Sequence, residues 1–64
     1  MRVNGQELIV KDEISLSEFL LGKGYDTDRV AVEKNGKIVR KGTFNTEMLS
    51  DDDSIEIVCF VGGG

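Results

Sequence analysis

Two Asn-Gly dipeptides constrain this chain more than any other feature of its sequence. Runs of strand-forming residues flank both of them: Met1–Val3 and Gln6–Val10 around Asn4-Gly5, and Val30–Lys34 and Lys37–Arg40 around Asn35-Gly36. Asn-Gly suits a type I′ turn because both central residues need a positive φ, and this turn matches the twist of paired strands. The sequence therefore predicts two β-hairpins.

A helix is predicted between the hairpins. Ser15 and Glu18 form the pattern of a capping box, with Ser15 as N-cap and the Glu18 carboxylate reaching back to its amide. The apolar positions that follow have helical spacing and share one face: Leu16, Phe19 and Leu20. Gly22 or Gly24 is expected to end the helix in a left-handed cap, with Tyr25 folding back onto the last turn.

The remainder of the chain predicts one more strand. Residues 43–49 suggest a short irregular or single-turn segment anchored in the core by Phe44 and Leu49, and residues 50–54 suggest a turn. The strand at 55–60 leads directly into residues 61–64. The order ββαββ(turn)β is that of an α+β protein with a β-grasp layout, in which a mixed sheet packs on one helix. We expect a β-grasp domain at 1–60 and a flexible, glycine-rich tail at 61–64.

Composition excludes several functions. A chain of 64 residues with a net charge of −4 forms one small domain, and its acidity disfavours binding to nucleic acid. With no histidine and only Cys59, it offers no His-based triad, no structural zinc site and no internal disulfide. The apolar stretches are too short to span a membrane, and no signal-peptide pattern is present. We expect a cytoplasmic protein with no metal site and no membrane or nucleic-acid partner.

The three terminal glycines carry the functional signal. Val61–Gly64 can extend roughly 13–14 Å at about 3.3–3.6 Å per residue, as a thread narrow enough to enter another protein's active site. The Gly64 carboxylate has no neighbouring Cβ, and adenylation by ATP would make it an electrophile. The alternative is a disordered end without a function. It is less favoured because the glycines follow a predicted core strand with no polar spacer.

The whole chain resembles the ThiS family, the sulfur carriers of thiazole formation in thiamine biosynthesis, which have the ubiquitin-like β-grasp fold. Five segments carry the resemblance: Val3–Gly5, Leu16–Leu20, Val30–Val39, the acidic turn Asp51–Asp53, and Ile55–Val58 with the ending Val61–Gly64. The resemblance implies that the last strand lies centrally and parallel to the first. Two departures are Asp51-Asp52-Asp53 where the family often has Asp-Gly-Asp, and Phe44 where it often has a larger residue. We expect the acidic turn to be kept with some left-handed strain.

The resemblance also implies a mechanism. An E1-like adenylyltransferase would adenylate Gly64 with ATP, and a persulfide from a donor such as a cysteine desulfurase would displace AMP to give a thiocarboxylate. A thiazole synthase would then take the sulfur. The chain would be a carrier co-substrate rather than an enzyme, with no bound cofactor and no catalytic side chain. A sulfur carrier for molybdopterin, cysteine or tRNA thiolation, and a ubiquitin-like protein modifier, are the alternatives.

Alternation along the last strand predicts on which face of the sheet each of its other candidate residues lies. Ile55, Ile57 and Cys59 should share the face toward the helix, so Cys59 is expected to be an inert core residue. Val58 and Phe60 should be exposed on the opposite face. We expect them, with Val61, to dock on the adenylating enzyme while Gly62, Gly63 and Gly64 enter its active site. The three aspartates are expected to form a solvated turn, because consecutive carboxylates do not make a calcium loop.

Overall fold

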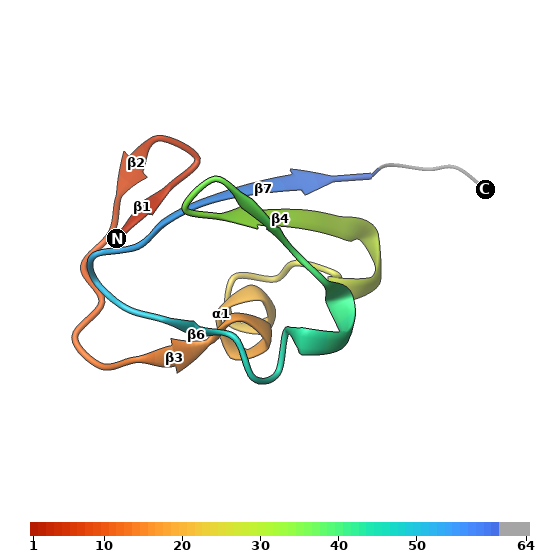
Figure 1. The fold of residues 1–64 in the computed structure, drawn as a ribbon, viewed down its shortest axis with the longest axis horizontal. Coiled ribbons are helices and arrows are strands. Elements are labelled where there is room, and N and C mark those ends of the chain that lie inside the picture. The colour runs from red at the N-terminus through yellow and green to blue at the C-terminus, as the bar shows by residue number, and fades with distance from the viewer. Residues whose placement is uncertain (61–64) are drawn as a thin grey trace.

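The structure is a computed structural model that describes residues 1–60. One α-helix packs beneath a layer of strands, with the N-terminus at one end of the molecule and the last strand running toward the other (Figure 1). The helices and strands follow one another in this order: β1 (Arg2–Val3), β2 (Gln6–Glu7), β3 (Ile14–Ser15), α1 (Leu16–Gly22), the 3₁₀ turn η1 (Thr27–Arg29), β4 (Val30–Lys34), β5 (Lys37–Val39), the 3₁₀ turn η2 (Lys41–Thr43), β6 (Met48–Leu49) and β7 (Ser54–Cys59).

The main sheet has the strand order β2-β1-β7-β4-β5, so the last strand lies in its centre. β7 runs parallel to β1 and antiparallel to β4, and the two hairpins form its flanks. This is the predicted mixed sheet on one helix, and the central position of β7 is confirmed. The predicted division of the chain at residue 60 stays a prediction, because residues 61–64 lie outside the described part.

Both Asn-Gly turns have the predicted backbone. Asn4 and Gly5 have φ values of 50° and 84°, and Asn35 and Gly36 have φ values of 52° and 85°. Strand pairing on either side follows, with Val3 opposite Gln6 and Lys34 opposite Lys37. The strand predicted to run from Gln6 to Val10 is shorter than expected and ends at Glu7.

The helix begins and ends close to the predicted residues. The Ser15 hydroxyl accepts a hydrogen bond from the Glu18 amide at 3.1 Å and donates one to the Glu18 carboxylate at 3.0 Å. The carboxylate thus meets the Ser15 hydroxyl, not the Ser15 amide that a full capping box would use. Gly24, with φ at 85°, is the left-handed residue of a Schellman motif, in which the Tyr25 amide donates to the Leu20 carbonyl at 2.9 Å.

A second small sheet was not predicted. β3 and β6 pair antiparallel, with Ile14 opposite Leu49 and Ser15 opposite Met48. The segment 43–49, predicted to be irregular or a single turn, starts at the last residue of η2, continues in a turn at residues 44–46 and ends in β6. A strand of two residues contains no alternating pattern that could reveal it, whereas the two predicted anchors of this segment, Phe44 and Leu49, are indeed buried.

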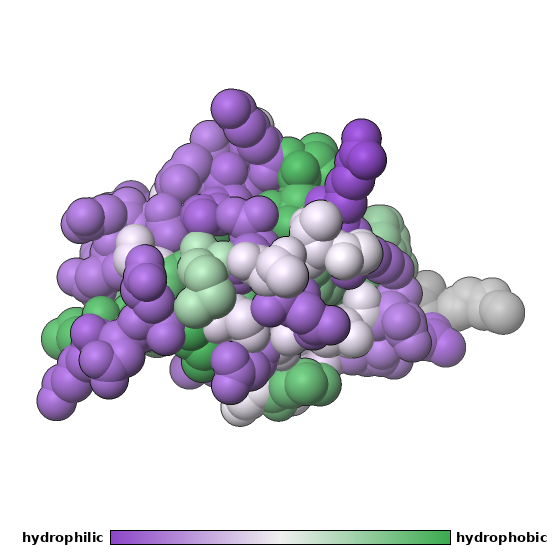
Figure 2. All heavy atoms as spheres, turned by 60° about the horizontal axis from the view of Figure 1, so that its bottom comes forward, coloured by the Kyte–Doolittle hydropathy of each residue, from purple (hydrophilic) through white to green (hydrophobic). Residues whose placement is uncertain are grey.

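One contiguous core lies between α1 and the main sheet. The predicted helix face is buried, and Leu16 and Leu20 are completely inaccessible. The buried apolar residues come from both layers and from the connecting segments: Met1, Leu16, Phe19, Leu20, Val30, Val32, Phe44, Leu49, Ile55 and Ile57. The face of the molecule drawn in Figure 2 is mainly hydrophilic, with separate hydrophobic areas.

The acidic turn differs from its prediction in two respects. Among residues 1–60, the non-glycine residues with positive φ are Asn4 and Asn35, so no aspartate of the turn is left-handed and the expected strain is absent. Asp51 and Asp53 were expected to be solvated, but their carboxylates accept hydrogen bonds from backbone amides. The Asp51 carboxylate accepts from the Val10 amide at 3.0 Å, and Asp53 accepts from the Ser50 amide at 2.8 Å.

Candidate functional site

The predicted reactive group lies outside the described residues. Gly64, and with it Val61, Gly62 and Gly63, belongs to the four positions beyond residue 60, so their predicted roles stay predictions. The structure does describe the strand that leads to them. The candidate site therefore comprises the last part of β7 and the residues that hold this strand in place.

β7 is held by hydrogen bonds on both sides. On the β4 side the register runs from Lys34 opposite Ile55 to Val30 opposite Cys59, and beyond it the Phe60 amide donates to the Arg29 carbonyl at 2.7 Å. On the β1 side the Asn4 side chain accepts from the Ile57 amide at 2.7 Å and donates to the Ile57 carbonyl at 3.2 Å. Asn4 thereby extends the parallel pairing beyond β1, and the chain is fixed in position up to Phe60.

The predicted exposure of Val58 and Phe60 is confirmed, since each side chain is 57% exposed. Val58 lies opposite Ala31 of β4, whose small side chain leaves it uncovered. Ile55 and Ile57 point to the core, as alternation requires. Two apolar side chains thus lie on the outer face of the sheet, directly before the predicted tail, and their role in binding a partner stays a prediction.

Cys59 is exposed, which contradicts its predicted place in the core. Alternation does put it on the helix side of the sheet, opposite the buried Val30. The cover over this face of the sheet therefore reaches Val30, which is 1% exposed, but not Cys59, its neighbour across the strand pair.

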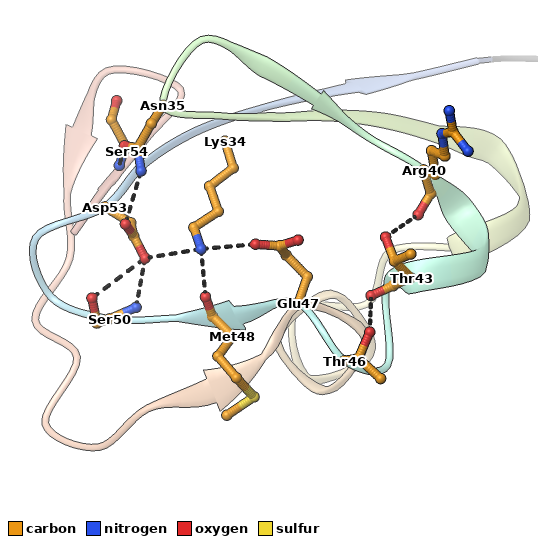
Figure 3. Close-up of polar contacts among 10 residues, drawn as sticks. All are labelled: Lys34, Asn35, Arg40, Thr43, Thr46, Glu47, Met48, Ser50, Asp53 and Ser54. Carbon is orange, nitrogen blue, oxygen red and sulfur yellow. Dashed lines mark hydrogen bonds and ion pairs between the residues drawn. The ribbon is translucent and has the colours of Figure 1, made fainter.

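The most connected polar cluster lies at the opposite end of β4. Lys34 donates to the Glu47 carboxylate and to the Met48 carbonyl, both at 2.8 Å, and its Nζ is 3.8 Å from Asp53 Oδ2 (Figure 3). The hydrogen bond to Glu47 raises the pKa of Lys34 above its ordinary value. Since Lys34 faces Ile55 at the start of β7, far along the strand from Cys59, this cluster ties β4 to the segment around β6.

Burial acts to raise the pKa of Asp53, but hydrogen bonds from Asn35 and from the Ser50 amide together hold it below its ordinary value. Asn35 also links the second turn to the start of β7, because its side chain donates to Asp53 at 2.9 Å and accepts from the Ser54 amide at 2.9 Å. Neither asparagine link could be predicted from the sequence, because a turn pattern says nothing about which strand the turn side chain meets.

The described 60 residues were also searched for a metal site, a membrane-spanning helix and a surface hollow. No group of three or more acidic or cysteine side chains there could hold a metal ion, and no helix is long and apolar enough to cross a membrane. A hollow opens at the β1–β2 hairpin and the end of α1, away from the end of β7. Apolar and polar side chains line it: Val3, Gln6, Leu8, Phe19, Lys23 and Tyr25.

The family of the chain follows from a comparison with models of known protein families. The model of the ThiS family matches residues 1–64. The chain belongs to the ThiS family. A solved relative has the same fold: the crystal structure of the thiamine biosynthesis protein ThiS from Geobacter metallireducens superposes with a TM-score of 0.82 and is 30% identical, over 98% of this chain and 96% of that one. The ubiquitin-like β-grasp fold of this ThiS-family chain is thereby confirmed.

Curated relatives of this ThiS-family chain include a separate carrier protein and two synthases. The sulfur carrier protein ThiS of Bacillus subtilis is 35% identical over all of this chain and 98% of its own length. The thiazole synthase of Magnetococcus marinus is 38% identical over all of this chain, and that of Paramagnetospirillum magneticum is 37% identical over 97% of it. This chain spans only about a fifth of the length of those two synthases. The relative from Bacillus subtilis is described as a sulfur carrier protein, and the solved relative from Geobacter metallireducens as a thiamine biosynthesis protein.

Proposed function

We propose that this chain carries sulfur on the carboxylate of Gly64 and delivers it to thiazole formation. The carboxylate attacks the α-phosphorus of ATP in an E1-like adenylyltransferase, which forms an acyl-adenylate and releases pyrophosphate. The terminal sulfur of a persulfide, supplied by a donor such as a cysteine desulfurase, displaces AMP. A thiol then cleaves the resulting S–S bond, so that the thiocarboxylate remains on Gly64 and the two thiols leave as a disulfide.

The way β7 ends carries this proposal. The strand is central in the sheet and is hydrogen-bonded up to Phe60, so the chain is held at a fixed point two residues before Gly62. A fixed departure point favours delivery of a terminal carboxylate, because less conformational entropy is lost when a partner binds the tail. The chain itself supplies no activating group for this chemistry, which the adenylyltransferase must therefore provide.

The outer face of β7 supplies a docking surface in this proposal. Val58 and Phe60 are exposed apolar residues next to the tail, and exposed apolar surface on a small acidic protein favours contact with a partner. We infer that Phe60 and Val58, together with Val61, bind the adenylyltransferase while Gly62 and Gly63 lie in its channel.

The thiazole synthases support thiazole formation as the destination of the sulfur. In two of them a segment similar to this whole chain occupies about a fifth of the polypeptide. A carrier-like segment within a synthase polypeptide supports the idea that the carrier and the synthase contribute to the same product. Carriage of sulfur to molybdopterin, cysteine or tRNA has no comparable support, and neither has conjugation to other proteins.

Intact-protein mass spectrometry tests the proposal. We expect co-expression with a cognate adenylyltransferase and a cysteine desulfurase to replace one oxygen of the carrier by sulfur, at Gly64. The variant that lacks Gly64 should stay unmodified, because its terminus falls one residue short in the channel. Adenylation without sulfur uptake, or conjugation to lysine side chains, would instead indicate a protein modifier, and loading of the truncated chain would contradict the assigned position.

A further inference from the structure

The strand β5 forms an open edge of the main sheet. It pairs with β4 on one side and ends the strand order β2-β1-β7-β4-β5. Lys34 and Lys37 flank the two-residue turn and pair with each other, so Glu33 and Ile38 form the next, non-hydrogen-bonded pair. The Ile38 amide and carbonyl consequently point away from β4. They offer one donor and one acceptor to an added strand.

Cationic residues concentrate around this edge. Residues 29–41 contain five of the eight lysines and arginines of the chain but only one of its twelve acidic residues. Some are already engaged: Arg29 is 3.5 Å from Asp26, Lys34 bonds to Glu47, and Lys41 donates to the Asp28 carbonyl at 2.6 Å. Lys37 and Arg40 form no ion pair with any carboxylate of residues 1–60.

The outer side of the edge also carries an apolar residue. Ile38 is 71% exposed and lies opposite Glu33, on the sheet face that bears Val58. Arg40 follows two residues later, so it continues on the same face as Ile38. A strand beside β5 would therefore meet an apolar side chain and, next to it, a cation.

We propose that β5 is a docking edge for an acidic, extended segment of a partner protein, which adds to the sheet as a further strand. Backbone bonds to Ile38 provide the pairing, the Ile38 side chain contacts an apolar residue, and Lys37 and Arg40 select carboxylates. All of these residues lie within the described domain, and none takes part in the proposed chemistry at Gly64.

Two other occupants fit this edge less well. A second copy of the chain would bring the cations of one β5 against those of the other, and like charges at an edge oppose pairing. A nucleic acid would have to approach a protein with a net charge of −4, and it would leave the open backbone groups and Ile38 unused. An acidic strand uses the cations, the backbone groups and the apolar side chain together.

A peptide titration followed by NMR tests this edge. The probe is a short, capped peptide of alternating valine and glutamate, added to the labelled full-length chain at low ionic strength. We expect the Ile38 amide to shift and to become protected from hydrogen exchange. The same peptide with N-methylated backbone amides should not produce this protection, because it cannot pair.

Two charge variants provide the matched comparison. Arg40→Glu should weaken peptide binding by about threefold to tenfold, since it replaces an attraction by a repulsion. Only the Arg40 backbone carbonyl takes part in the local fold, where it accepts from Thr43. Lys11→Glu makes the same change in net charge at an exposed position away from β5 and should leave binding unchanged.

Several outcomes would overturn the proposal. These are the absence of binding, equal binding of a valine–lysine peptide, equal weakening by Lys11→Glu, or shifts confined to Val58 and Phe60 without protection of Ile38. Binding of single-stranded oligouridylate in place of the acidic peptide would assign the edge to nucleic acid. Because sulfur loading at Gly64 is measured separately by mass, failure of this proposal and failure of the carrier chemistry are distinguishable.

Discussion

Phe60 is the residue at which the described domain and the proposed chemistry meet. Its backbone amide is bonded to Arg29, while its side chain is more than half exposed. The backbone bond fixes where the chain leaves the sheet, and the free side chain is left to contact a partner. The two contributions are separable, because a substitution of the side chain does not remove the amide.

Replacing Phe60 by alanine should therefore impair loading without unfolding the domain. We expect the KM for the carrier in adenylation to rise about fivefold or more, because a large apolar contact with the partner is lost. Steady-state pyrophosphate release at subsaturating carrier measures this effect. Ile9→Ala is the matched control, since Ile9 is 84% exposed but precedes β3, away from the end of β7. A Phe60 variant that loads like the parent chain would contradict docking through this side chain.

The helix α1 illustrates the element scale, because two glycines near its end have opposite requirements. Gly22 is the last helical residue, whereas Gly24 has φ at 85° and forms the left-handed cap. At both positions a Cβ would meet no atom within 4 Å. Backbone conformation alone should therefore decide the effect of an added methyl group.

Alanine at these two positions should change stability in opposite directions. Gly24→Ala should lower the free energy of unfolding by about 1 kcal/mol, because a Cβ is strained in the left-handed region. Gly22→Ala should raise it by about 0.5–1 kcal/mol, because alanine is the better helix former. Urea denaturation of the two variants provides the measurement. Equal effects of the same sign would show that the cap does not limit helix stability.

At the scale of the whole molecule, side-chain hydrogen bonds connect segments that are not paired as strands in the main sheet. Lys34, Asn35 and Asp53 join the second hairpin to β6 and to the start of β7 (Figure 3). Asp51 similarly joins the acidic turn to Val10. In a domain of this size, with a small core, such connections make a proportionally large contribution to stability.

The lowered pKa of Asp53 predicts how acid affects stability. A carboxyl group whose pKa is depressed in the folded state contributes stability above its unfolded pKa, near 4, and loses it as the pH falls through the folded value. The parent chain should thus be more stable than Asp53→Asn at pH 7, and the difference should shrink below about pH 4.

Urea midpoints at a series of pH values measure this difference. Asp52→Asn is the matched control, because Asp52 is exposed and makes no hydrogen bond to residues 1–60. It should differ little from the parent chain at any pH. A difference between the parent chain and Asp53→Asn that stays constant with pH would show that the loss comes from the altered hydrogen bonds of the amide and not from the charge of Asp53.

Local patterns in the sequence were sufficient for the two hairpins, the helix, the last strand and the exposure of two apolar residues at its end. The two Asn-Gly turns, the helix face and the exposure of Val58 and Phe60 all follow from preferences within a few residues, which the rest of the fold did not override. Cys59 could not be placed in the same way. Alternation tells which face a residue lies on, but only the packing of the other elements decides whether the residue is covered.

The pairing of distant segments was decided by tertiary structure alone. β3 with β6, Lys34 with Glu47, and Asn4 with Ile57 join residues whose sequence neighbourhoods contain no sign of one another. The open edge at β5 is of the same kind, since a strand becomes an edge only when the order of the whole sheet is set. The turns and the helix depend on contacts that are local in the chain. The surfaces available to partners depend on which elements the core brings side by side and which it leaves without a neighbour.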